Sequence, residues 1–176
     1  MFISSCGAKQ AVQRENPDFR NVKWGDSSET VKQYEMETEL SETSAGLIGA
    51  VRVENLDAWL IYTFDGSDTL HTAVYDFNKL NYSNAGQYIP IYEGLKESLI
   101  QKYGEPSKDE IVKMADQSLI DMAGESNALE YGYVTYVAYW ETDKADISIG
   151  LLAQNYEVHL VISYNDPNYD SNNSGL

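Results

Sequence analysis

The residues most often used in catalysis are scarce in this sequence. Its 176 residues include one cysteine, Cys6, and two histidines, His71 and His159. Neither histidine has an acidic neighbour at the spacing of a metal site, so we expect both to be outward-facing strand residues. No G-x-S-x-G nucleophile turn, phosphate-binding glycine loop or dinucleotide fingerprint occurs. The sequence predicts a protein that is not an enzyme and has no metal site and no cofactor, with a small hydrolase built on paired carboxylates as the weaker alternative.

Tyrosine and tryptophan are the other residues with binding chemistry, because their rings stack while their polar atoms form hydrogen bonds. The chain has 14 tyrosines and 3 tryptophans. The segment 131–140 carries aromatic or apolar residues at both strand parities. It is either an exposed platform for a glycan or peptide, or a central strand covered on its second face by the helices expected before it, and we favour the covered strand. The candidate binding residues are Tyr133, Tyr136, Tyr139, Trp140 and Trp59.

The chain carries a net charge of −16 at pH 7, and 43% of its residues are hydrophobic. This composition predicts a folded domain with a substantial core. An acidic surface repels phosphate backbones and anionic lipid headgroups, so we expect no nucleic acid partner and no direct membrane binding. No block of five or six like charges occurs, which favours a solvated acidic surface over a dedicated site for a basic partner or a cation.

Hydrophobic periodicity predicts the elements that must position these residues. The first helix begins at Asp26-Ser27-Ser28-Glu29, which has the pattern of a capping box with Asp26 as the cap. The second helix follows Pro90 and ends at Gly104. The segment 107–128 is expected to form one or two short helices, because it opens on another capping-box pattern, Ser107-Lys108-Asp109-Glu110. The expected strands are 47–53, 58–64, 69–77, 132–140, 146–152 and 156–164.

The two halves of the chain are similar to each other. A shift of 88 residues places Trp59 on Ile147, and a shift of 68 places Val31 on Leu99. The two shifts differ by 20 residues, and the second half contains extra chain at 107–128. This segment is therefore expected to be an insertion in the second half. The predicted fold is α+β: a tandem repeat of a helix followed by a three-stranded antiparallel meander, forming one sheet with helices packed on one face. The expected organisation is a single domain at 19–165 with repeats at about 19–80 and 86–165, followed by a disordered tail at 166–176.

The first residues, Ile3-Ser4-Ser5-Cys6-Gly7, resemble a bacterial lipobox, in which small residues precede a cysteine that receives a lipid. Residues 1–18 are then a lipobox-like start and a linker, with Cys6 as the lipid attachment site. The resemblance implies an exported protein that is anchored to the cell membrane and faces outside. Five residues before Cys6 are fewer than an export signal needs, so lipidation requires a longer start. The alternative is an unmodified cysteine in a cytoplasmic protein.

Three further motifs resemble those of uncharacterised exported lipoproteins of Firmicutes. They are Phe19–Ser27 with Trp24-Gly25-Asp26-Ser27, the helix end Leu99–Ser107 with Lys102-Tyr103-Gly104, and the hairpin Trp140–Ile149 with Trp140-Glu141-Thr142-Asp143. More distantly, the plan of helices and strands is similar to β-lactamase-inhibitor-like proteins and small outer-membrane-assembly lipoproteins, which bind proteins. The resemblance implies a non-catalytic, surface-anchored binding module for a protein or peptide of the cell envelope. A carbohydrate-binding module that uses exposed Tyr and Trp is the alternative, and the oligomeric state is left open.

Overall fold

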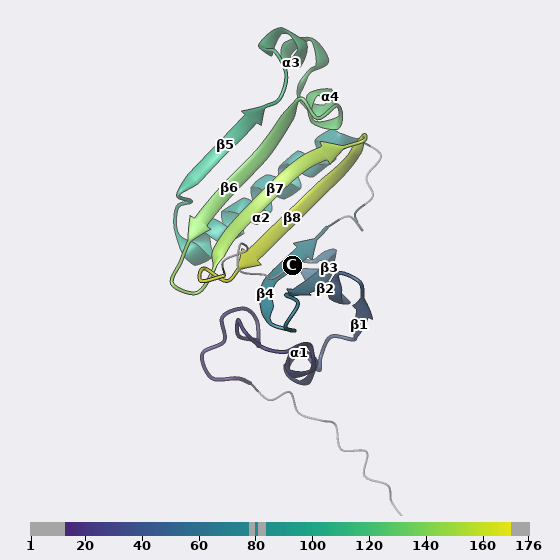
Figure 1. The fold of residues 1–176 in the computed structure, drawn as a ribbon. Coiled ribbons are helices and arrows are strands. Elements are labelled where there is room, and N and C mark those ends of the chain that lie inside the picture. Colours follow the sequence, from purple (N-terminus) through teal and green to yellow (C-terminus); the bar gives the residue numbers. More distant parts are fainter. Residues whose placement is uncertain (1–12, 78–79, 81–83, 170–176) are drawn as a thin grey trace, which may run out of the picture.

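The computed structural model describes residues 13–77, 80 and 84–169. These residues form one open antiparallel sheet of eight strands with four α-helices and a short 3-10 helix (Figure 1). The strand order is β1-β2-β3-β4-β8-β7-β6-β5, so the two halves of the chain meet at β4 and β8. The strands are β1 (Leu40–Thr43), β2 (Gly46–Val53), β3 (Leu56–Phe64), β4 (Leu70–Asp76), β5 (Lys108–Lys113), β6 (Val134–Glu141), β7 (Asp146–Gln154) and β8 (Glu157–Asn165); the helices are α1 (Ser28–Tyr34), η2 (Ala85–Gln87), α2 (Tyr88–Tyr103), α3 (Gln117–Ala123) and α4 (Glu125–Glu130).

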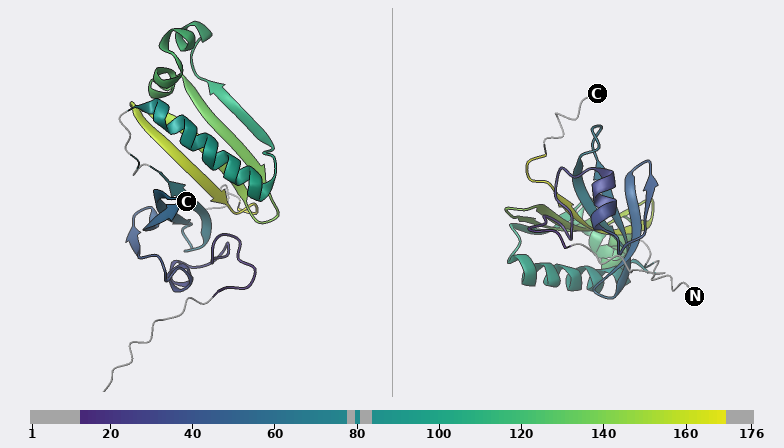
Figure 2. Two further views of the ribbon diagram at one scale, coloured as in Figure 1. Left: turned by 180° about the vertical axis from the view of Figure 1, so that it is seen from behind. Right: turned by 90° about the horizontal axis from the view of Figure 1, so that it is seen from below.

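The hydrophobic core lies on one face of this sheet. Buried and more accessible residues alternate along the strands, as expected when only one face is covered. Helix α2 runs behind β5–β8 in Figure 1 and in front of them when the molecule is seen from behind (Figure 2). The predicted α+β class with a single antiparallel sheet is confirmed. The helix residues in the core are Val31 of α1, Tyr88, Tyr92, Leu95 and Leu99 of α2, and Ala128 and Leu129 of α4.

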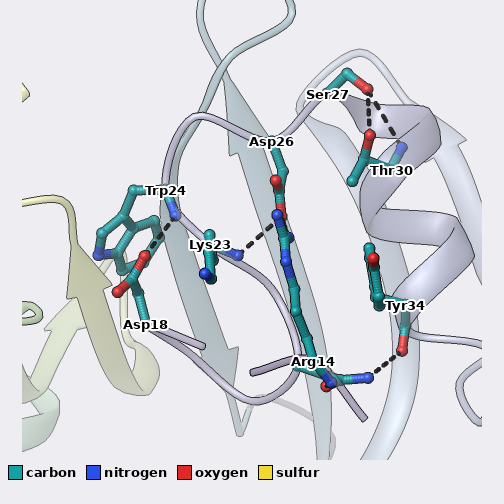
Figure 3. Close-up of polar contacts among 9 residues, drawn as sticks. Arg14, Asp18, Lys23, Trp24, Asp26, Ser27, Thr30 and Tyr34 are labelled. Atoms are coloured by element: carbon teal, nitrogen blue, oxygen red, sulfur yellow. Dashed lines mark hydrogen bonds and ion pairs between the residues drawn. The ribbon is translucent and has the colours of Figure 1, made fainter. Parts of the chain in front are cut away.

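The start of α1 differs by one residue from the predicted capping box. Ser27 is the N-cap, because its Oγ accepts a hydrogen bond from the backbone N–H of Thr30 at 3.2 Å. The carboxylate of Asp26 instead accepts the backbone N–H of Lys23 at 2.8 Å and pairs with the guanidinium of Arg14 (Figure 3). Asp26 therefore joins the N-terminal segment to the domain rather than capping the helix.

The segment that was expected to be helical at 107–128 begins as a strand. β5 pairs with β6 from Lys108 opposite Tyr139 to Lys113 opposite Val134. The local capping pattern favours a helix, but the β-branched pair Ile111-Val112 suits a strand, and an unpaired neighbouring strand is available. α3 and α4 follow β5, at the end of the sheet in Figure 1. Two strands, β1 and β5, are therefore added to the six predicted, one at each edge.

The predicted alignment of the two halves of the chain is wrong by one residue. The shift of 88 residues places Trp59 on Ile147, but Ile147 is buried in the core and Trp59 lies on the opposite face. Side chains alternate between faces with a period of two, so an error of one residue exchanges the faces. A shift of 89 residues carries the buried Leu60 of β3 onto the buried Ile149 of β7.

Residues 166–169, which the sequence assigns to a disordered tail, have a defined structure. The backbone N–H of Asp166 donates to the carbonyl of His71 at 2.9 Å. The ring of Tyr169 stacks on the imidazole of His71, with 4.0 Å between the ring centroids. Residues 166–169 therefore pack on the sheet, whereas Cys6 and the rest of the predicted tail lie outside the described residues.

Candidate functional site

A groove of 610 Å³ runs along α2, on the side that faces the turn between β2 and β3. The opposite wall consists of Glu54 and Leu56. Glu54 and Asn55 have φ angles of 50° and 65°, as a tight two-residue hairpin turn requires. The helix residues in the groove recur every three or four positions, so they form one stripe along α2. They are Gln87, Pro90, Ile91, Gly94, Leu95 and Ser98.

Gly94 lies in the middle of this stripe. A glycine inside a helix is less stable than alanine by about 0.5–1 kcal/mol. Crowding does not explain it, because a Cβ added at Gly94 would have no atom within 4 Å. At this position the backbone of α2 is therefore accessible to whatever enters the groove.

The groove continues into a second hollow of 240 Å³ near the centre of the sheet. Aromatic rings from separate parts of the chain surround it. Phe19 lies 4.7 Å from Tyr164 of β8 and 5.4 Å from Tyr75 of β4, and Tyr103 of α2 lies 6.4 Å from Tyr164, all between ring centroids. The two hollows share Glu54, Leu95 and Ser98 in their linings, and so lie next to each other.

Tyr75 and Tyr164 in this hollow are neutral hydrogen-bonding groups. Burial raises the pKa of Tyr75, and this effect outweighs the neighbouring Arg20, which lowers it. Burial also raises the pKa of Tyr164, and the nearby Tyr103 raises it further. Their hydroxyls can donate and accept hydrogen bonds throughout the physiological pH range, which suits peptide groups better than ions.

An ion pair stiffens the wall of this hollow. The Nε of Arg20 donates to both carboxylate oxygens of Glu35 at 3.1 Å, and its Nη2 donates to the Oγ1 of Thr38 at 3.3 Å. Burial acts to lower the pKa of Arg20, but the hydrogen bonds and charge of Glu35 outweigh burial and raise it. Glu35 is only 3% exposed, so the pair neutralises its own charges inside the wall. The remaining charged residues of the hollow are Asp18, Glu54 and Lys102.

Two of the predicted binding residues are buried in the core. Tyr136 and Trp140 face α2, with exposures of 5% and 3%. The hydroxyl of Tyr136 donates to Glu125 at 3.2 Å, and the Nε1 of Trp140 donates to the carbonyl of Gly104 at 2.8 Å. The alternative in which these two rings form an exposed platform is therefore wrong, because α2 and α4 cover that face.

The other three predicted residues are separated. Trp59 and Tyr139 lie on the uncovered face, 36% and 41% exposed, but β4, β8 and β7 lie between their strands. Trp59 and Tyr139 are therefore four strand spacings apart, or about 19 Å. Tyr133 precedes β6 and packs edge-on against Tyr131. The expectation that helices cover both faces of β6 is also wrong, because Tyr139 is exposed.

The histidines lie away from the groove. The Nδ1 of His71 is 2.9 Å from the Oγ1 of Thr72, and His159 lies on β8 opposite Leu152. Among the described residues, no group of three or more His, Cys, Asp or Glu side chains could hold a metal ion. No helix in the described part of the chain is long and apolar enough to span a membrane.

The groove residues were missed at the sequence level, although one signal pointed to them. The helical periodicity of α2 identifies its buried stripe, which includes Leu95 and Leu99. A second stripe with Ile91 and Gly94 lies beside it, and a glycine inside a helical pattern often has a packing or functional role. Comparisons with protein-family models, curated proteins and solved structures found no match to this chain.

Proposed function

We propose that this protein is a non-catalytic binding module that holds an extended segment of another protein or peptide in the groove along α2. The observation that carries this proposal is Gly94. It weakens its own helix, it has free space where a Cβ would be, and it lies midway along a groove of 610 Å³. A ligand backbone that packs against the helix at this point accounts for all three properties.

The dimensions of the groove suit an extended chain. Gln87 and Ser98 are eleven residues apart, or about 16 Å along the helix axis. An extended peptide of about five residues has this length. The walls at Leu56, Ile91 and Leu95 are apolar, and the tyrosine hollow at one end offers hydroxyls for hydrogen bonds. We infer a ligand with apolar side chains at alternate positions.

The charged residues around the groove indicate which ligand charge would be favoured. Arg20 is already paired with Glu35, while Glu54 is exposed at the junction of the two hollows. The molecule as a whole carries a charge of −16. A basic residue next to the apolar ones would therefore be favoured, both at Glu54 and during approach to the surface.

We also propose that the fold is a tandem repeat, now of a helix followed by four strands. In support, a shift of 89 residues carries the facing pair Leu47–Tyr62 onto the facing pair Tyr136–Leu151. The edge strands also correspond, since β1 precedes β2 as β5 precedes β6. Two residues join β1 to β2, whereas the longer segment 114–133 joins β5 to β6. In this interpretation the inserted segment carries α3 and α4, and the groove lies where the two repeats meet.

The location of the protein is a separate proposal. We propose that Cys6 carries a lipid that anchors the module at the outer side of the cell membrane, on the strength of the pattern Ile3-Ser4-Ser5-Cys6. Mass spectrometry of the protein purified from its native host tests this. A diacylglyceryl group on Cys6 is expected, and a free thiol at Cys6 would refute the anchor without affecting the groove.

The binding function is tested by selecting ligands from a phage-displayed library of random peptides. We expect enrichment of sequences with alternating apolar residues and at least one Lys or Arg. Glu54→Lys should weaken these peptides, with Glu97→Lys on the solvent side of α2 as the charge-matched control. Recovery of no peptide above background, or of peptides that bind both variants equally, would contradict the proposal.

A further inference from the structure

The free edge of β5 is the second surface on which several observations converge. β5 is a terminal strand of the sheet, so one side of its backbone has no neighbouring strand within the described part of the chain. In an antiparallel ladder, alternate residues direct both backbone groups toward the partner strand. The backbone N–H of Met114, just after β5, donates to the carbonyl of Tyr133, just before β6, at 2.8 Å. By this alternation, the free edge presents the N–H and C=O groups of Asp109, Ile111 and Lys113.

Two copies of β5 that run antiparallel to each other can match these three side chains. If a second β5 pairs with the first so that all three residues are matched, Ile111 faces Ile111 of the second copy. Asp109 then faces Lys113 of the second copy, and Lys113 faces its Asp109. Opposite charges that face each other directly across two strands are favourable. Within one copy, Asp109 pairs with Lys96 of α2 at 3.0 Å, and the Nζ of Lys113 donates to Gln117 at 2.6 Å, so each charged group would gain a second partner in the dimer. Lysines on edge strands usually prevent such pairing, but in this register each lysine meets a carboxylate.

The side chains near this edge also suit an interface. Ile111 is 52% exposed although it is β-branched and lies in a strand. Further along the same connection, Met114, Leu119 and Met122 are exposed, and Met122 is 82% exposed. Four exposed apolar side chains in one short stretch of chain are more than a solvated edge requires. The other edge strand, β1, has one charged residue, Glu42, so two copies of it cannot match opposite charges in this way.

We propose that the chain forms a two-fold symmetric dimer through antiparallel pairing of β5 with β5 of a second copy, with Ile111 on the symmetry axis. Each facing pair at the free edge forms two backbone hydrogen bonds. The interface is isologous, so it closes at two copies and leaves β1 as the outer edge of the combined sheet. The groove along α2 is not part of this edge, so the dimer and the binding function can fail independently.

Sedimentation velocity of the full chain over a range of concentrations tests the dimer. We expect Lys113→Asp to weaken the dimer roughly tenfold or more, because two attractive pairs become repulsive. Asp109→Lys should have a similar effect, and the double variant Asp109→Lys/Lys113→Asp should restore dimerisation to within a few-fold. Circular dichroism checks that each variant remains folded. A wild-type chain that is monomeric up to millimolar concentration would overturn the proposal, as would a dimer that none of these variants weakens.

The register is tested by oxidative cross-linking in a Cys6→Ala background. Facing residues in a hydrogen-bonded pair have Cα atoms about 5.5 Å apart, within the range of a disulfide. Ile111→Cys should therefore cross-link to itself. Lys113→Cys should not, because its two copies would lie about 13 Å apart along the strands. Equal cross-linking of both variants, or cross-linking of Lys113→Cys alone, would rule out the proposed register.

Discussion

At the scale of single residues, two neighbouring tyrosines illustrate how a hydroxyl contributes to the core. The rings of Tyr92 and Tyr136 lie 5.7 Å apart beneath α2. The hydroxyl of Tyr136 donates to Glu125. The hydroxyl of Tyr92 is buried and has no hydrogen-bond partner among the described residues. A buried polar group without a partner is destabilising, so the two hydroxyls should contribute with opposite signs.

This contrast predicts opposite effects of the same substitution. Tyr136→Phe should lower the free energy of unfolding by about 0.5–1.5 kcal/mol, because it removes a hydrogen bond. Tyr92→Phe should leave it unchanged or raise it by up to about 1 kcal/mol, because it removes only an unsatisfied group. Urea denaturation of both variants measures the difference. Equal destabilisation by the two substitutions would mean that the Tyr92 hydroxyl has a partner.

The same tyrosines predict how stability depends on pH. Burial, followed by the charge of Glu125, raises the pKa of Tyr136 from 10.0 to about 12, and burial also raises the pKa of Tyr92. A group whose pKa is higher in the folded state favours folding below its unfolded value and loses this contribution as pH rises through its folded value. The protein should therefore lose stability between about pH 10 and pH 12. Ultraviolet absorbance of tyrosinate and circular dichroism should change together in this interval, and tyrosine ionisation well below it with the fold intact would contradict the burial.

The buried ion pair gives a further prediction at this scale. Arg20→Met should lower the free energy of unfolding by about 2–4 kcal/mol, because it leaves the carboxylate of Glu35 buried and unpaired. The double variant Arg20→Met/Glu35→Gln should be more stable than Arg20→Met alone. Chemical denaturation of the single and double variants measures this coupling. If the double variant were as unstable as the sum of both single variants, the two side chains would not be coupled.

At the scale of elements, the sequence predicts those parts of the structure that depend on local pattern. The end of α2 at Gly104 and the strands β7 and β8 follow from caps, turns and alternation, and all are present. β5 was missed because Lys108-Asp109-Glu110 fits a helix cap equally well, and only the neighbouring β6 decides in favour of a strand. The groove is not predicted because it depends on how the β2–β3 turn approaches α2, and apart from the glycine inside the helix, contacts so distant in sequence leave no local signal.

Gly94 of α2 is expected to affect both the stability of the protein and the binding of its ligand. Gly94→Ala should raise the free energy of unfolding by about 0.5–1 kcal/mol, because it improves the helix and meets no neighbouring atom. This corresponds to a rise in melting temperature of about 1–4 °C, measurable by calorimetry. A fall in melting temperature would show that the helix needs glycine for its own packing, and the argument for a ligand at this point would lose its basis.

At the scale of the whole molecule, the acidic surface and the position of the groove act together. A net charge of −16 attracts basic segments from a distance, and salt screens this attraction over roughly 8–10 Å at physiological ionic strength. The groove itself lies between α2 of the second half of the chain and a turn of the first half. Under the proposed function, the surface attracts the ligand and the groove between the halves selects it.

This division of roles predicts a kinetic effect of salt. The association rate of a selected basic peptide should fall steeply as ionic strength rises, while its dissociation rate should change little. Surface plasmon resonance at several salt concentrations measures both rates. If ionic strength changed the dissociation rate more than the association rate, the charges that govern binding would lie inside the groove instead.

The measurement that tests the central claim most directly is the affinity of one selected peptide for three forms of the protein. The forms are wild type, Gly94→Leu and Glu97→Leu, compared by isothermal titration calorimetry. Gly94→Leu fills the groove, whereas Glu97→Leu adds the same side chain at an exposed position of α2 outside it. If the ligand backbone packs against α2 at Gly94, the peptide should bind Gly94→Leu at least about tenfold more weakly, a loss of about 1.4 kcal/mol, and Glu97→Leu as tightly as wild type. Equal affinity of the peptide for all three forms would contradict the account.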